Sequence, residues 1–127
     1  MVDPLNAALK SASNGMEVQS LRLRTVNENI SNVDTPGYHR KLLTFGIGSG
    51  DTSVEVKRLT LDPAEGKSVL DPGHPLADES GYVTLSNVDL MVEMADAREA
   101  KRTFDSNLEA FRQARDMYAG LIGLLRR

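Results

Sequence analysis

The sequence has no cysteine and no tryptophan, and aromatic residues make up only 5% of its 127 residues. Without cysteine the chain cannot form disulfides or use a thiol in catalysis. Its two histidines, His39 and His74, stand beside no recognisable nucleophile or set of metal ligands. We therefore expect a protein that is not an enzyme and that holds no metal or other cofactor.

Long apolar runs are also missing. No stretch approaches the roughly 20 residues that span a bilayer, and the start of the chain lacks the basic and apolar regions of a cleaved signal peptide. The net charge of −3 predicts no general affinity for nucleic acid. Residues 62–86 carry five acids and one base, whereas residues 87–127 carry seven of each. We expect no nucleic-acid binding and no membrane insertion, and the balanced ends favour contact between helices.

Apolar residues recur at alternating steps of four and three near the start of the chain. This spacing is typical of a helix that packs in a coiled coil. Asp3 and Pro4 suit a helix start, while Asn32 can cap the end and Pro36 prevents continuation. We predict a helix that ends at about Asn32. The apolar positions are Leu5, Leu9, Ala12, Met16, Leu23, Val26 and Ile30.

The same spacing returns near the end of the chain and predicts a second long helix. Ser86 and Asn87 resemble its N-cap, with Asp89 in the first turn. Gln19, Lys101 and Arg115 interrupt the two apolar stripes. They are either locally exposed to solvent, or they set the register or pair with a neighbouring subunit. The apolar positions are Leu90, Met94, Ala97, Phe104, Leu108, Phe111, Tyr118, Ile122 and Leu125.

The middle of the chain has short β-type segments at 41–45, 53–61 and 81–85, separated by glycine and proline. The Gly46-Ile-Gly-Ser-Gly50 stretch lacks the spacing of a nucleotide-binding loop and predicts a hairpin loop. The predicted fold is mainly α. Residues 1–32 and 87–127 form a helical coiled-coil domain, residues 33–86 form a small β-hairpin or irregular insert, and the whole is one structural unit.

Residues 29–41, NISNVDTPGYHRK, connect the first helix to this insert. Their Asn-Ile-Ser matches the glycosylation pattern by chance, because it falls on the predicted helix. The proline and glycine suit a tight turn, and the basic pair Arg40 and Lys41 is placed to meet acids on a neighbouring subunit. We interpret the stretch as a joint rather than a binding site. Its turn motif comprises Asn29, Asn32, Thr35, Pro36, Gly37 and Tyr38.

Three stretches resemble the flagellar axial proteins, which form the rod, the hook and the hook-associated structures. They are NENISNVDTPGYHRK at 27–41, LDPGHPLADESGYVTLSNVDL at 70–90 and NVDLMVEMADAREAKRTFDSNLEAFRQARDM at 87–117. The middle stretch is similar to a subunit of the proximal rod. The Thr-Pro-Gly-Tyr that directly follows the helix end also resembles the sister proximal-rod subunit FlgB. Lys101 and Phe104 depart from the family, which more usually has a small residue and tyrosine there.

The resemblance implies a structural subunit of the bacterial flagellar basal body, exported by the flagellar type III apparatus without a cleaved signal. Such a subunit polymerises helically in the periplasm with itself and with rod proteins such as FlgB, FlgF, FlgG and FliE-like proteins. Its terminal helices would line the export channel of the torque-transmitting shaft. More remotely, the two helices suit a soluble coiled-coil adaptor or chaperone. We expect Leu5, Leu9, Met16, Leu23, Val26 and Ile30 to pack against Leu90, Met94, Phe104, Leu108, Phe111 and Ile122 and against neighbouring subunits.

Overall fold

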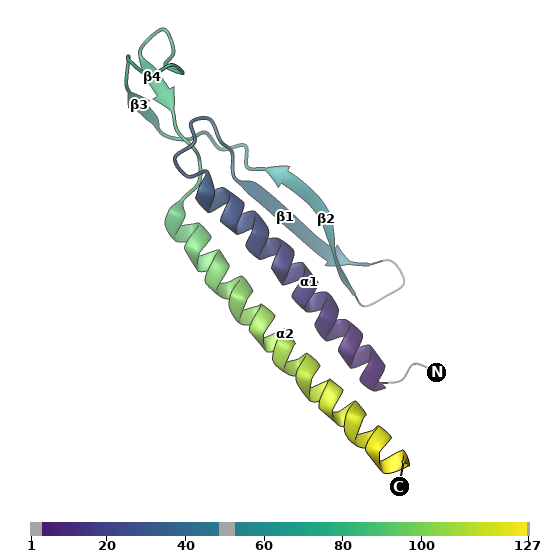
Figure 1. Cartoon of the computed structure of the whole chain (residues 1–127). Coiled ribbons are helices and arrows are strands. Elements are labelled where there is room, and N and C mark those ends of the chain that lie inside the picture. Colours follow the sequence, from purple (N-terminus) through teal and green to yellow (C-terminus); the bar gives the residue numbers. More distant parts are fainter. Residues whose placement is uncertain (1–3, 49–52, 127) are drawn as a thin grey trace.

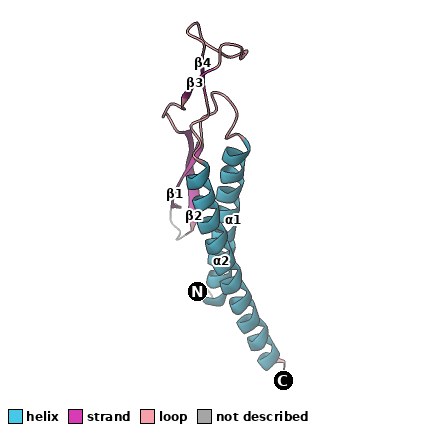
Figure 2. Ribbon diagram, turned by 90° about the vertical axis from the view of Figure 1, so that its left-hand side faces the viewer, coloured by secondary structure: helices cyan, strands magenta, loops and turns pink. Residues whose placement is uncertain are grey.

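The computed structural model describes residues 4–48 and 53–126. Helices α1 (Pro4–Ser31) and α2 (Leu90–Leu125) lie side by side and run in opposite directions (Figure 1). Between them in sequence come β1 (Lys41–Ile47), β2 (Val54–Leu61), β3 (Ser68–Leu70) and β4 (Tyr82–Thr84). The β1–β2 hairpin lies against α1, and β3–β4 projects from one end of the molecule (Figure 2). The prediction of two terminal helices around a small strand insert is confirmed.

The predicted boundaries differ from the structure in two places. The cap of α2 is Asp89, whose carboxylate accepts a hydrogen bond from the Met91 amide at 3.0 Å. Asn87 was the wrong choice of cap, because its side chain is used to hold the preceding loops together. Strand β3 was missed, since three residues between glycine and proline carry too weak a pattern. Asp3, the predicted cap of α1, and residues 49–52 of the predicted hairpin loop lie outside the described residues.

The contact between α1 and α2 is made by small residues. Ala12 and Ala114 are buried, and Ala100 has no exposed surface. A Cβ atom placed on Gly15 would lie 2.7 Å from the Asn107 side chain. The helices therefore approach closely at these positions.

Three buried positions of α2, Glu93, Ala100 and Ala114, lie one residue before predicted positions, whereas the predicted Ala97, Phe104, Leu108, Phe111 and Ile122 are half-buried. Glu93 and Ala100 are buried, whereas Met94 and Lys101 are exposed. Arg115 is exposed as well, and its guanidinium lies 3.5 Å from the carboxylate of its neighbour Asp116. Within this chain the polar positions of the α2 stripe therefore face solvent.

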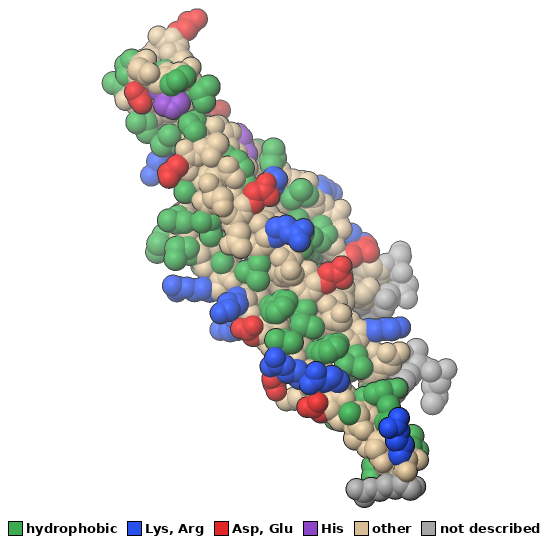
Figure 3. All heavy atoms as spheres, in the orientation of Figure 1, with side chains coloured by type: hydrophobic (Ala, Val, Ile, Leu, Met, Phe, Trp, Pro, Cys, Tyr) green, Lys and Arg blue, Asp and Glu red, His purple; other side chains and the backbone are tan. Residues whose placement is uncertain are grey.

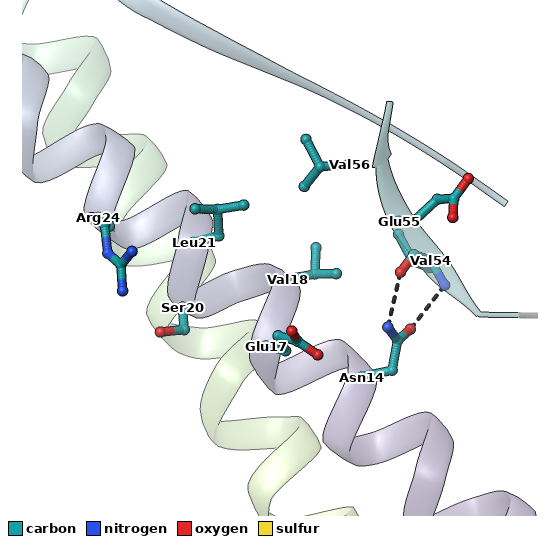
Figure 4. A pocket seen from close by; sticks show the side chains of 9 residues that line it. All are labelled: Asn14, Glu17, Val18, Ser20, Leu21, Arg24, Val54, Glu55 and Val56. Carbon is teal, nitrogen blue, oxygen red and sulfur yellow. Dashed lines mark hydrogen bonds between the residues drawn. The ribbon is translucent and has the colours of Figure 1, made fainter. Parts of the chain in front are cut away.

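A second face of α1 receives the β1–β2 hairpin. Val18 and Thr25 are buried on this face, and Val18 and Leu21 point towards β2 (Figure 4). Near the start of α1, the Asn14 amide accepts from the Val54 amide at 2.8 Å and donates to the Val54 carbonyl at 2.9 Å. An open groove of about 430 Å³ remains between helix and strand. Helix α1 thus has two packing partners, which are α2 and the β1–β2 hairpin.

A β-bulge keeps the apolar residues of the hairpin on one face. The register shifts between Thr44 and Phe45, so that Thr44 pairs with Arg58 but Phe45 pairs with Val56. The sequence of β2, VEVKRLTL, breaks strict alternation at the Lys57-Arg58 pair. The extra residue restores the alternation, which places Val54, Val56 and Leu59 opposite Ile47, Phe45 and Leu43, while Leu61 stands opposite Lys41.

Candidate functional site: the buried junction at the end of α1

Asn29 is the centre of a buried polar junction. Its side chain is only 1% exposed. The amide oxygen accepts hydrogen bonds from the Lys41 backbone amide at 2.8 Å and from the Tyr38 hydroxyl at 2.9 Å. The amide nitrogen donates to the Lys41 carbonyl at 3.1 Å and to Glu93 Oε2 at 3.4 Å. One asparagine therefore supplies the partner that an edge strand would otherwise lack.

The charge at the centre of the junction is Glu93, which has no exposed surface. The Arg40 Nε donates to Glu93 Oε1 at 2.7 Å. Arg40 also lies 3.6 Å from a carboxylate oxygen of Asp96 and 3.9 Å from one of Asp62. Burial of a carboxylate is costly unless the group is paired and hydrogen-bonded. Arg40 and Asn29 together meet this requirement.

Asn87 connects the junction to the loops before α2. Its side-chain oxygen, Oδ1, accepts a hydrogen bond from the Arg40 backbone amide at 2.6 Å. Its amide nitrogen donates to the carbonyls of Asp62 at 3.1 Å and Ala64 at 2.8 Å. The Asn87 backbone amide donates to the Tyr38 carbonyl at 3.1 Å. Three chain segments are thus fixed to one another by a single side chain and its own backbone.

The Thr-Pro-Gly-Tyr turn brings the chain from α1 into this junction. The Thr35 hydroxyl donates to Asn32 Oδ1 at 3.0 Å, and the Tyr38 amide donates to the Thr35 carbonyl at 3.2 Å. Gly37 has a φ of 75°, which a residue with a side chain rarely adopts, and its amide donates to the Thr84 carbonyl at 3.0 Å. The turn therefore also connects to β4, as expected of a joint.

Both residues of the basic pair, Arg40 and Lys41, have acidic partners within the chain. Arg40 pairs with Glu93, and the Lys41 ammonium pairs with the Glu28 carboxylate of α1. Both charges therefore already have acidic partners within the chain, and contact of either with another subunit stays a prediction. The acids were not recognised as partners because they lie 53 residues after Arg40 and 13 residues before Lys41.

Two groups in the junction hold their protons more tightly in the folded chain. Burial raises the pKa of the Tyr38 hydroxyl above its usual 10.0, and the Glu28 carboxylate adds to the rise. The hydrogen bond to Glu28 raises the pKa of the Lys41 ammonium above 10.5. A raised folded-state pKa gives stability that is complete below the unfolded pKa and is lost as pH rises through the folded value. The junction is therefore weakened by strongly alkaline solution.

We expect Tyr38→Phe to reduce this loss of folding stability at alkaline pH. At neutral pH the variant should lose about 1 kcal/mol, because the hydroxyl no longer donates to Asn29. As pH rises above the usual tyrosine pKa of 10.0, the difference from the parent chain should shrink, because only the parent has a Tyr38 proton to lose. Urea unfolding across an alkaline pH series measures both effects. A constant difference at every pH would contradict the assignment.

The sequence-predicted residues are spread over several environments. The turn motif comes together at the junction, with Asn29 buried and Tyr38 bonded to it. Among the predicted packing residues Val26 is buried, while Leu90 and Met94 are each 43% exposed. The roles of all of these in assembly remain predictions. The half-buried packing positions are Leu5, Leu9, Met16, Leu23, Ile30, Phe104, Leu108, Phe111 and Ile122.

Sequence reasoning missed Glu93, and it assigned Asn87 a different role. Glu93 lies four and seven positions before Ala97 and Ala100, so its place on the small-residue face was a signal that could have indicated burial. Gln19 lies near the seam, and its buried Oε1 has no hydrogen-bond partner among the described residues. Hydrogen bonds connect the side chains of Tyr38, Asn29, Glu93 and Arg40 in the junction. The junction is suited to holding chain segments in place.

Metal clusters and membrane-spanning helices are absent from the described ranges, 4–48 and 53–126. No cluster of three or more histidine and acidic residues there could hold a metal ion. Neither α1 nor α2 is apolar enough over a sufficient length to cross a membrane.

Comparison with known proteins assigns the chain to a family. Residues 9–39 match the family model "Flagella basal body rod protein", and residues 79–124 match "Flagellar basal body rod FlgEFG protein C-terminal". The flagellar basal-body rod protein FlgC of Agrobacterium fabrum is 48% identical over 98% of both chains. FlgC of Aquifex aeolicus is 33% identical over 93% of this chain and 94% of its own. FlgC of Salmonella typhimurium is 31% identical over 84% of this chain and 87% of its own. The two-helix fold, its turn motif and these matches lead to one conclusion: the chain belongs to the FlgC family of flagellar basal-body rod proteins and is a structural subunit of the flagellar rod.

Proposed function

We propose that the chain polymerises helically in the periplasm, where its paired terminal helices form the inner wall of a torque-transmitting shaft and export channel. Its partners are further copies of itself and rod proteins of the FlgB, FlgF, FlgG and FliE types. The flagellar export apparatus delivers it without a cleaved signal. In this arrangement residues 1–32 and 87–127 form a coiled-coil layer, and residues 33–86 form the insert outside it.

The observation that carries the proposal is the apolar surface left on α2. A soluble monomer rarely leaves large apolar side chains gathered along one helix, and such surface marks a contact with other protein. Two isolated helices joined by a narrow seam of small residues gain little stability from packing. Contacts with neighbours would cover this surface. The exposed large apolar residues of α2 are Leu90, Met91, Val92, Met94, Met117, Tyr118, Leu121, Leu124 and Leu125.

The buried junction has a specific role in this proposal. Torque passed through a subunit would change the angle between its helix pair and its strands unless the connection between them is stiff. Asn29 and Arg40 join α1, the start of β1 and α2 through hydrogen bonds in a water-poor site. Connected polar networks of this kind resist rearrangement, because each broken bond leaves a buried group unpaired. The junction thus holds the two parts of the subunit at a set angle.

Met91→Ala tests the proposal, because the Met91 side chain is 77% exposed. Its loss should change the stability of the isolated chain by no more than about 0.5 kcal/mol. If neighbours cover this residue in the rod, incorporation into basal bodies and swimming should fall sharply while export continues. Secreted protein, basal-body composition and swimming speed measure the three steps separately.

Arg98→Ala is the matched control, because Arg98 is another exposed residue of α2, two turns further along the helix. It should leave incorporation close to that of the parent chain. Full incorporation of the Met91→Ala variant, together with that of Leu23→Ala and Phe111→Ala, would contradict packing through these helices. If these variants failed to be exported, rather than being exported but not incorporated, that result would contradict the packing as well.

A further inference from the structure

The far end of α2 extends beyond the start of α1 and projects from the rest of the molecule (Figure 1). The seam on α2 includes the buried Ala114. The same spacing of four and three continues to Tyr118, Leu121 and Leu125, which are 44%, 51% and 85% exposed. A Cβ atom on Gly120 would meet no atom within 4 Å. The seam therefore continues past α1 as an apolar stripe that nothing in the described chain covers.

This end of α2 is also basic. Among residues 112–126 the bases are Arg112, Arg115 and Arg126, and the single acid is Asp116. All three arginines are exposed. A surface that covers the stripe gains electrostatic energy if it is acidic around its apolar centre.

The opposite end of the molecule has the complementary character. The β3–β4 tip, residues 68–84, contains three acids and neither lysine nor arginine. Val83 is buried, but other large apolar residues of the tip are exposed, with Leu70 at 60% and Leu76 at 64%. Figure 3 shows acidic and hydrophobic side chains at the tip, and basic and hydrophobic ones towards the far end of α2. The acids of the tip are Asp71, Asp78 and Glu79.

We propose that the exposed end of α2 binds the β3–β4 tip of a second copy of the chain, head to tail. The inference rests on the proposed function and names one contact within it. The two surfaces lie at opposite ends of an elongated molecule (Figure 1), so one chain cannot satisfy its own contact. A heterologous contact of this kind propagates along a line of subunits instead of closing a pair. The stripe that continues the α1–α2 seam is then covered by the next subunit along that line.

Disulfide cross-linking tests the contact directly, because the chain has no cysteine of its own. One full-length variant carries Leu121→Cys and another carries Leu76→Cys. After mixing and mild oxidation, a mixed disulfide dimer should form, and a chain with both substitutions should give a ladder of covalent oligomers. The same two variants are then oxidised in basal bodies isolated from cells that express both. Non-reducing electrophoresis with immunodetection identifies the products.

The control pair is Leu121→Cys with Arg58→Cys, since Arg58 is an exposed residue of β2, away from the tip. Arg126→Glu should lower the yield of the mixed dimer by up to about fivefold at low salt, as the loss of an exposed ion pair would. Glu79→Arg in the partner should restore the yield.

Four results bear on the contact itself. Yield no higher than the control in both purified chains and basal bodies would overturn it. Preferential Leu121→Cys homodimers would overturn it too, since they would indicate that two α2 ends pair. Cross-linking of Leu121→Cys to a cysteine introduced into a different rod protein, at a higher yield than to Leu76→Cys, would assign the stripe to that protein instead. Absence of the cross-link from basal bodies that contain normal amounts of the chain would reject this contact while leaving the proposed function intact.

Discussion

Replacing Glu93 by alanine should lower the free energy of unfolding by about 3–5 kcal/mol, which is the usual cost of breaking a buried ion pair by removing one partner. The Glu93 carboxylate has no exposed surface and accepts the Arg40 Nε hydrogen at 2.7 Å. Without it, the Arg40 guanidinium retains only Asp96 at 3.6 Å and Asp62 at 3.9 Å. The Asn29 amide nitrogen loses an acceptor at the same time. Urea unfolding followed by circular dichroism measures the change.

Glu99→Ala is the matched control for this prediction. Glu99 is also a carboxylate of α2 that pairs with an arginine, here Arg22 at 3.4 Å, but its side chain is 59% exposed. Its removal should cost at most about 1 kcal/mol, because water screens the pair and can replace it. Glu93→Gln keeps the shape and the acceptor oxygen while removing the charge, so its cost should lie between the two. Equal costs for Glu93→Ala and Glu99→Ala would show that the junction does not depend on a buried charge.

Gly66→Ala should destabilise the chain by about 3 kcal/mol or more, at the upper end of the cost of inserting a methyl group into a packed site. A Cβ atom at Gly66 would lie 1.8 Å from the Leu85 carbonyl oxygen and 2.7 Å from its carbon. Both are backbone atoms, so no side-chain rotation can relieve the overlap. The two loops would have to separate, which breaks the 2.8 Å hydrogen bond from the Leu85 amide to the Lys67 carbonyl.

Hydrogen exchange at the Leu85 amide measures this separation, because that amide loses its partner when the loops move apart. Gly73→Ala is the control, since a Cβ atom there meets nothing closer than Asp71 Oδ1 at 3.9 Å. It should change stability by no more than about 0.5 kcal/mol. A Gly66→Ala chain that keeps full protection at Leu85 would contradict the close approach of these loops.

The helices could be predicted because their signals are local. The four-three spacing, Pro4 near the start and Pro36 after the end identify α1 to within one residue of its observed end at Ser31. The joint at residues 29–41 could be predicted from its turn residues. Strand β3 could not, because three exposed residues, Ser68–Leu70, are defined only by pairing with β4.

The partners inside the junction could not be predicted in the same way. Glu93 looks like an ordinary charged residue of a helix, and its burial depends on Arg40, which lies 53 residues away. The three buried positions of α2 lie one residue before the predicted ones for a related reason. Large apolar residues dominate the spacing signal, yet the chain pairs its helices through Ala100 and Ala114. Small residues carry little hydrophobicity, so a pattern search assigns them less weight than their packing merits.

The asparagine at the centre of the junction also implies an order of folding. Asn29 bonds to Lys41 across 12 residues but to Glu93 across 64. Closing the longer loop costs about 1.5 kcal/mol more in chain entropy, since the cost grows with the logarithm of loop length. The helix end and the hairpin can therefore associate early, through contacts that are close in sequence. We therefore expect α2 to dock last. Until then Arg40 would stay in contact with water, and α1 with its hairpin would present a surface that lacks its second helix.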